Sequence, residues 1–211
     1  MKSFKKYLFV SIIILLLVAC ERDLLNEEFY KPMIYLKSGE NNIFPYPHQL
    51  NDSVTTGYMT VGSGGSMPLR NDVLVTIETD FEILDHYNYR FFGDETDKFA
   101  KLIPDDRLVI PSFDVVIRAG DVAATTFFPI EIDVNGLSPD TTYMFPVRIE
   151  SAENYEINTD KDYVMYKIEL ENAYSSMSSR MYKLKGIKTE NEIMSNITTN
   201  KTLLPISRNQ V

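Results

Sequence analysis

The thiol of Cys20 is the clearest reactive group in the sequence, because it is the only cysteine of the chain and it closely follows an apolar run. Three lysines precede the run, which covers residues 8–18, and the small Ala19 separates the run from the cysteine. A basic start, an apolar stretch and a small residue form the layout of a cleaved secretory signal. As a helix, the run would rise about 16 Å, against a hydrocarbon core of about 30 Å. We therefore expect it to be removed and not to span a membrane.

This start of the chain resembles a bacterial lipoprotein signal peptide. In that family the cysteine thiol is acylated, and the amine freed by cleavage is usually acylated as well. The resemblance implies a signal peptide at residues 1–19, lipid on Cys20 and an acylated tether at residues 20–30. Two or more alkyl chains hold a protein stably on a bilayer, because each buried methylene contributes about 0.8 kcal/mol. An ordinary secretory cleavage that leaves a free thiol is the alternative.

The charge of the chain narrows the range of its partners. The 211 residues include 21 Lys and Arg against 30 Asp and Glu, for a net charge of −9. Removal of residues 1–19 takes away three lysines and no acid, which leaves 18 bases against 30 acids and a net charge of −12. Such a surface repels phosphate backbones and anionic membrane faces. We expect no nucleic-acid partner, and membrane contact only through the lipid on Cys20.

Residues 31–171 show the pattern of an all-β domain, with short runs of β-branched and aromatic residues between Gly, Pro, Asn and Asp. Two prolines in residues 43–47 lack N–H donors and predict a sheet edge there. The glycine-rich residues 62–66 suit a flexible connector. In residues 34–36, Ile34 and Leu36 would point to the core. Other strands are expected at residues 56–61, 73–79, 108–110, 114–118, 125–133, 143–150 and 163–171.

The strongest fold marker is the group Leu137, Pro139 and Tyr143. In sandwich domains a tyrosine near the start of one strand returns its hydroxyl to the backbone a few residues upstream, in a tyrosine corner. The sequence therefore predicts an immunoglobulin- or fibronectin-like Greek-key β-sandwich of roughly seven or eight strands over residues 31–171. Strand alternation would point Tyr143, Phe145, Val147 and Ile149 into the core, and Met144, Arg148 and Glu150 outward.

Residues 81–106 form a long insertion between two expected strands. Their secondary structure is ambiguous, since apolar residues recur at helical spacing from Phe81, whereas Tyr87, Tyr89 and Phe91 alternate as in a strand. Long ordered loops on a rigid sheet are where binding groups gather. Aromatic rings present flat apolar faces that can stack on sugars. We take Tyr87, Tyr89 and Phe91 as candidate ligand-binding residues, with packing in the core as the alternative.

Catalytic, metal and cofactor chemistry find no support in the sequence. His48 lies in a proline-flanked segment and His86 in the insertion, and neither has another soft metal ligand nearby. The carboxylates within residues 94–97 and 105–106 show neither the cleft and separation of a glycosidase pair nor the spacing of a calcium loop. We expect a protein that is not an enzyme and that holds no metal or cofactor.

The composition changes after residue 171. Residues 172–180 are rich in serine and suit a linker, and residues 181–186 and 201–206 are strand-like. Only 40 residues follow Glu171, which is below the usual size of an independent domain without disulfides. We therefore interpret residues 181–211 as the incomplete start of a second β domain, in a chain truncated relative to a longer parent.

The chain resembles the Bacteroidota surface lipoproteins whose N-terminal domain, of unknown function, is shared with exported family 18 glycoside hydrolases. The resemblance covers most of residues 20–171 and rests on Glu21-Arg22-Asp23 after the cysteine, on Ile34-Tyr35-Leu36, and on residues 113–120 and 137–148. It implies an outer-membrane lipoprotein displayed on the cell surface, with the periplasmic face as the alternative. It also implies a module for glycan capture or surface architecture, and it supplies no catalytic residue.

Three functions therefore stay open. The first is a non-catalytic cell-surface module that binds or captures glycan. The second is an adhesin or assembly subunit whose sheet edges pair with other surface proteins, and the third is a structural spacer for a missing C-terminal domain. Separately, Asp52-Ser53-Val54 and Asp140-Thr141-Thr142 match the acceptor pattern of Bacteroidota O-glycosylation, although Thr141 also fits the turn of the tyrosine corner.

Overall fold

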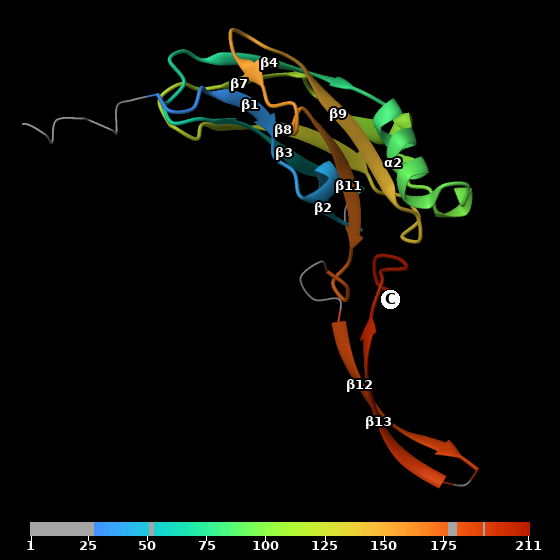
Figure 1. The fold of residues 1–211 in the computed structure, drawn as a ribbon. Coiled ribbons are helices and arrows are strands. Elements are labelled where there is room, and N and C mark those ends of the chain that lie inside the picture. The colour runs from blue at the N-terminus through green and yellow to red at the C-terminus, as the bar shows by residue number, and fades with distance from the viewer. Residues whose placement is uncertain (1–27, 51–52, 177–180, 192) are drawn as a thin grey trace, which may run out of the picture.

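The computed structural model describes residues 28–50, 53–176, 181–191 and 193–211. The predicted signal peptide and the lipidation site Cys20 lie outside these residues. Two curved sheets pack face to face, as Figure 1 shows. Sheet A has the order β10 (Glu156–Ile157), β1 (Met33–Leu36), β3 (Val54–Gly64), β8 (Thr125–Asp133) and β6 (Leu108–Val109). Sheet B has the order β2 (Ile43–Gln49), β11 (Tyr163–Glu171), β9 (Tyr143–Ala152), β4 (Val73–Thr79) and β7 (Asp114–Ile117), with β5 (Lys101–Leu102) beside β9.

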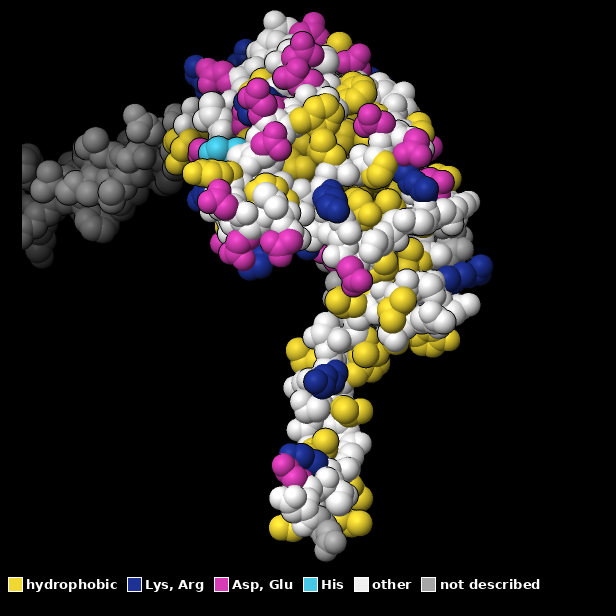
Figure 2. All heavy atoms as spheres, turned by 90° about the vertical axis from the view of Figure 1, so that its right-hand side faces the viewer, with side chains coloured by type: hydrophobic (Ala, Val, Ile, Leu, Met, Phe, Trp, Pro, Cys, Tyr) yellow, Lys and Arg dark blue, Asp and Glu magenta, His cyan; other side chains and the backbone are white. Residues whose placement is uncertain are grey.

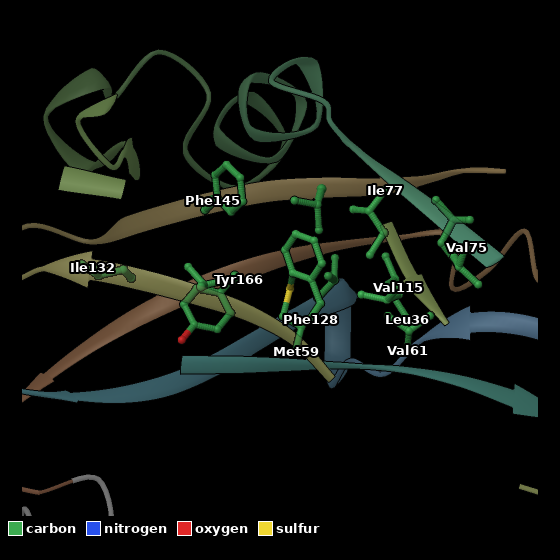
Figure 3. Close-up of a cluster of buried hydrophobic side chains, with 14 of the residues drawn as sticks. Leu36, Met59, Val61, Val75, Ile77, Val115, Phe128, Ile132, Phe145 and Tyr166 are labelled. Carbon is green, nitrogen blue, oxygen red and sulfur yellow. The ribbon is translucent and has the colours of Figure 1, made fainter. Parts of the chain in front are cut away.

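The predicted all-β sandwich is confirmed, and its core is the apolar space between the sheets. Inward residues alternate along each strand, so that Phe128, Ile130 and Ile132 of β8 are fully buried. Phe145 and Tyr166 of sheet B belong to the same buried cluster, in which Figure 3 shows them with Phe128 and Ile132. This period of two buries one face of every central strand. It explains why the expected strands at 73–79, 125–133 and 163–171 coincide with β4, β8 and β11.

The edges of sheet B follow the proline pattern. Strand β2 carries Pro45 and Pro47 and lies at one edge of the sheet, where it pairs in parallel only with β11 within the sheet. A central position would require N–H donors that these prolines lack. The predicted edge strand is therefore confirmed.

The predicted flexible connector at residues 62–66 is wrong for its first half. Strand β3 continues through Gly64, and its last residues pair with β1 in the register Tyr35↔Gly62 and Met33↔Gly64. A Cβ placed on Gly62 would lie 2.9 Å from Cζ of Tyr35. Glycine is present here because the ring of Tyr35 lies across the strand, and not because the backbone needs freedom.

The turn before β9 has the contact of a tyrosine corner. The hydroxyl oxygen of Tyr143 accepts a hydrogen bond from the backbone N–H of Ser138 at 3.4 Å. Leu137 is buried beside this turn, and Pro139 is half-buried. The N–H of Thr141 donates to the carbonyl of Ser138 at 3.1 Å, so this residue is part of the turn. Asp52 of the other predicted O-glycosylation motif lies outside the described residues.

A third layer covers part of the outer face of sheet B. The helix α2 (Glu82–Phe92) follows β4, and a loop with the 3-10 turns η2 (Thr96–Lys98) and η3 (Asp105–Arg107) returns the chain to the sheet. Leu84 and Ala100 of this insertion pack on Met144 and Met165 in a second apolar cluster. Met144 does point away from the main core, but it is buried beneath the helix instead of facing solvent.

The side chain of Asn88 fastens α2 to its return loop. Its Nδ2 donates to the carbonyl of Ala100 at 2.9 Å, and its Oδ1 accepts from the N–H of Ala100 at 2.8 Å. Both partners are buried and cannot bind water, so loss of either hydrogen bond would leave an unsatisfied polar group in the interior. The ambiguous residues 81–92 are thus helical because Leu84 and Asn88, one turn apart, have a surface to cover.

The C-terminal part of the chain forms a hairpin of β12 (Met181–Glu190) and β13 (Ile193–Thr202), a two-stranded sheet of its own that projects from the sandwich (Figure 1). The expected strand at residues 181–186 lies in β12, whereas the expected strand at 201–206 is mostly wrong, because β13 ends at Thr202. Asn172 Nδ2 donates to the carbonyls of Ser207 and Gln210 and holds the end of the chain near the sandwich. No helix among the described residues is long and apolar enough to cross a bilayer.

A buried hydrogen-bond chain links the two sheets. The ring of His48 is 1% exposed, and its Nδ1 lies 2.6 Å from Oγ1 of Thr55 while its Nε2 lies 2.7 Å from the hydroxyl of Tyr166. Gly57 makes room for it, since a Cβ there would lie 1.8 Å from the Tyr166 oxygen. Burial lowers the pKa of His48 from 6.5 to about 4, and burial raises the pKa of Tyr166. The histidine is therefore neutral in the folded protein at neutral pH.

The buried His48 in this hydrogen-bond chain makes the free energy of unfolding depend on pH. Because the folded state disfavours the charged ring, the stabilisation is complete above pH 6.5 and is lost as pH falls toward 4. The full loss should be about 3 kcal/mol in the free energy of unfolding. Urea unfolding from pH 7.5 to 4.5 should show it, and His48→Gln should have a shallower decline over the same range. Equal slopes for the two proteins would contradict the assignment.

Candidate functional site

A groove of about 460 Å³ lies where α2 meets the outer face of sheet B, and we name it the α2 groove. Arg148 of β9 and Tyr163 of β11 line its sheet side, Asp80 lies at the entry to α2, and Tyr87 and Phe91 line its helix side. Apolar rings and charged groups therefore meet in one concave surface. Such a combination is typical of sites for small polar ligands.

Arg148 makes two ion pairs and a ring contact at the groove. Its Nε lies 3.0 Å from Oδ2 of Asp80, and its Nη1 lies 3.3 Å from Oδ2 of Asp162. Its guanidinium carbon lies 5.9 Å from the ring centroid of Tyr163, in cation–π contact. Asp80 lies before α2, whereas Asp162 and Tyr163 are consecutive at the start of β11, so two segments of the chain hold the guanidinium. It can present fixed N–H donors to a ligand at low entropic cost.

The helix side of the groove is aromatic. The ring centroids of Tyr87 and Phe91 are 4.8 Å apart, and the guanidinium of Arg90 lies 5.5 Å from the centroid of Phe91. Tyr87 is half-buried against the second apolar cluster, whereas Phe91 is 46% exposed. Glu82 and His86 also line the groove and are exposed. The wall therefore offers one firmly packed ring and one accessible ring.

Two of the three predicted ligand-binding residues lie together. Tyr87 and Phe91 are one helical turn apart and line the groove, whereas Tyr89 is 71% exposed and does not line it. The alternation of the three rings would place them on one face of a strand, but a helix turns Tyr89 about 200° from Tyr87. Sequence reasoning did not connect Asp80 and Arg148 with this site, because strand pairing brings together positions that are far apart in the chain.

Of the carboxylates and histidines considered in the sequence, only His86 lines the α2 groove. The carboxylates at 94–97 and 105–106 are exposed on the return loop, where Glu95 forms an ion pair with Lys98. His48 is buried between the sheets and His86 lies at the groove. Within the described ranges, no cluster of three His, Cys, Asp or Glu side chains could hold a metal ion.

The fold is shared with known Bacteroides structures. A protein of unknown function from Bacteroides ovatus matches with a TM-score of 0.61 and 18% identity over 84% of this chain and 60% of its own. A multidomain protein including DUF1735 from the same species matches with a TM-score of 0.61 and 18% identity over 83% and 58%. An auxiliary nutrient binding protein from Bacteroides thetaiotaomicron matches with a TM-score of 0.50 and 14% identity over 78% and 56%.

These structures show the fold, and this chain spans only about 60% of the length of the first of them. No curated protein matches the chain. Residues 29–156 match the model of a protein family described as a "-like, N-terminal domain". That match covers the sandwich from before β1 to the start of β10, which is more than half of the sequence. The chain therefore belongs to this family of N-terminal domains, in agreement with its resemblance to the Bacteroidota β-sandwich domain.

Proposed function

We propose that the protein is a non-catalytic surface module that binds a neutral glycan in the α2 groove. The observation that carries the proposal is the arrangement of Phe91 and Tyr163 around the fixed guanidinium of Arg148. Aromatic rings can cover the apolar face of a sugar, while charged and amide groups take its hydroxyls. The name of the auxiliary nutrient binding protein, which shares the fold, is compatible with this role.

The charges of the groove favour a neutral ligand. Asp80 and Glu82 balance Arg90 and Arg148 among the lining residues. Neither sign of charge dominates, so the attraction of a charged sugar to one part of the groove would be offset by repulsion from the other part. Hydroxyl groups, which both donate and accept, fit such a mixed lining.

The same contacts argue against glycoside hydrolysis. A glycosidase needs two carboxyl groups that face each other across the bond, one of them to give a proton. Asp80 and Asp162 are both ion-paired with the single guanidinium of Arg148. We therefore assign these carboxylates to holding Arg148 in place.

The location belongs to the same proposal. A lipid on Cys20, nine residues before Phe29, would hold the sandwich close to the outer membrane through a short tether. The acidic residues after the cysteine and the nutrient-binding relative support display on the outer surface. A glycan-capture module needs that side, because polysaccharides do not cross the membrane.

The accessible ring gives the sharpest test of the groove. In the soluble chain from Glu21 onward, Phe91→Ala should weaken retention on gels of neutral polysaccharides such as xyloglucan or galactomannan about tenfold, which is about 1.4 kcal/mol. Tyr89→Ala removes an aromatic ring from the same helix outside the groove and should have no effect. Both proteins should keep the wild-type melting temperature. Equal losses in the two variants, or no retention on any neutral gel or host-glycan array, would refute the proposal.

A second candidate function, sheet-edge assembly, rests on the β12–β13 hairpin. Among the described residues its two strands pair only with each other, which leaves the outer backbone edge of each strand unpaired there. Leu184 and Ile197, next to Gly186 on the same face, are 52% and 37% exposed. Figure 2 shows apolar side chains along the hairpin, and both apolar and acidic side chains over the sandwich. An isolated two-stranded hairpin is marginally stable in water, so we infer that a second copy adds strands to it.

Assembly is testable by mass. The chain from Glu21 onward should elute as a dimer in size-exclusion chromatography with light scattering at about 50 μM, since weak interfaces have micromolar affinity. Ile197→Asn should shift it to a monomer, while Val109→Asn, which changes an exposed apolar residue of the sandwich, should not. A wild-type monomer would refute assembly. A monomer that also fails to bind glycan would leave the role of a spacer.

A further inference from the structure

A second groove, of about 400 Å³, lies over the outer face of β1, next to the edge strand β10 of sheet A, and we name it the β1 groove. Ile34 and Leu36 of this strand point into the core, so Tyr35 and Lys37 point outward. Lys161 and Asn158, from the segment before β11, form the opposite wall. The α2 groove lies on the outer face of sheet B, so the two grooves belong to opposite faces of the sandwich.

The floor of the β1 groove is an aromatic ring laid on glycines. Tyr35 pairs across the strands with Gly62, and a Cβ on Gly62 would lie 2.9 Å from Cζ and 3.0 Å from the hydroxyl of Tyr35. A Cβ on Gly64 would lie 3.6 Å from Cε1 of the same ring. The ring therefore rests on bare backbone with one face, and the groove lies above it. A ring in this position is a stacking platform.

The charge of this groove opposes that of the domain. Residues 31–171 contain 24 Asp and Glu against 11 Lys and Arg. Among the described residues, the lining of the β1 groove nevertheless includes Lys31, Lys37 and Lys161 and no acidic residue. In an acidic domain, this local excess of cations indicates a site where an anionic ligand would bind favourably.

The three ammonium groups are not neutralised by strong ion pairs. Nζ of Lys161 donates to Oγ of Ser38 at 3.0 Å, to the carbonyl of Gly39 at 3.2 Å and to Oδ1 of Asn42 at 3.0 Å, all of them uncharged acceptors. Lys31 lies 3.6 Å from Glu156, with both side chains mostly exposed, a contact worth little in water.

Lys37 is exposed, and it has no ion pair among the residues that the structure describes.

We propose that the β1 groove binds a carboxylate-bearing sugar, such as a uronic acid residue of a polysaccharide. Its ring face stacks on Tyr35 and its carboxylate is held by Lys37, while Lys161, whose three N–H groups already bind protein oxygens, adds positive charge nearby. The side-chain oxygen of Asn158 accepts from the backbone N–H of Asp160 at 3.0 Å, and its amide nitrogen, which has no hydrogen bond among the described residues, can donate to a sugar hydroxyl. The site is separate from the α2 groove, and its ligand differs in charge.

The test uses oligogalacturonate and the same oligomer as its methyl ester, with the chain from Glu21 onward in isothermal titration calorimetry. The ester keeps the rings and removes the charge, so it should bind at least about tenfold more weakly. Lys37→Gln and Tyr35→Ala should each weaken binding of the free acid about fivefold to tenfold. Lys185→Gln on the hairpin removes the same charge far away and should change nothing.

Two further proteins and one further ligand keep the result specific. Phe91→Ala should leave oligogalacturonate binding intact, which separates this site from the α2 groove. Gly62→Ala should weaken binding by lifting the ring of Tyr35, with the sandwich still folded by circular dichroism. Dextran sulfate offers charge without the carboxylate. If it bound as well as oligogalacturonate and Tyr35→Ala changed neither, the binding would be general charge attraction and the proposal would be overturned, as it would if the acid did not bind.

Discussion

The structure depends on burying both faces of β9 and β11. Their inward residues, such as Val147 and Tyr166, fill the sandwich, and their outward Met144 and Met165 need a second cover. A strand that is apolar on both faces is stable only between two layers. Helix α2 supplies the second layer, and the α2 groove exists because this helix covers the sheet only partly, which leaves Arg148 and Tyr163 at the margin. The same helix therefore both buries the outward methionines and forms one wall of the α2 groove.

Much of the sandwich could be predicted, because alternation along a strand is a local property. The bounds of β4, β8 and β11 and the edge position of β2 follow from it. The helix could not be separated from a strand, since the residues that decide it, Leu84 and Asn88, need a surface formed elsewhere in the chain. The same limit applied to residues 62–64, whose glycines signalled freedom, although they serve to receive a ring from a neighbouring strand.

The candidate site was predictable in its region and not in its composition. The long insertion pointed to α2, and two of the three chosen rings line the groove. Asp80, Arg148 and Asp162 meet only through strand pairing and a turn, so no spacing in the sequence announces them. The β1 groove was missed for another reason. Its lysines are scattered over 130 residues in a chain whose overall charge is negative, and only the fold gathers them.

The way α2 is fastened has a consequence for how such domains can diversify. Leu84, Asn88 and Tyr87 attach the helix, whereas Glu82, Arg90 and Phe91 touch the groove without supporting the core. Exposed helix positions can change with little effect on folding. Related domains could therefore change the lining of this groove by drift at three or four helix positions, while one unchanged sandwich continues to fold.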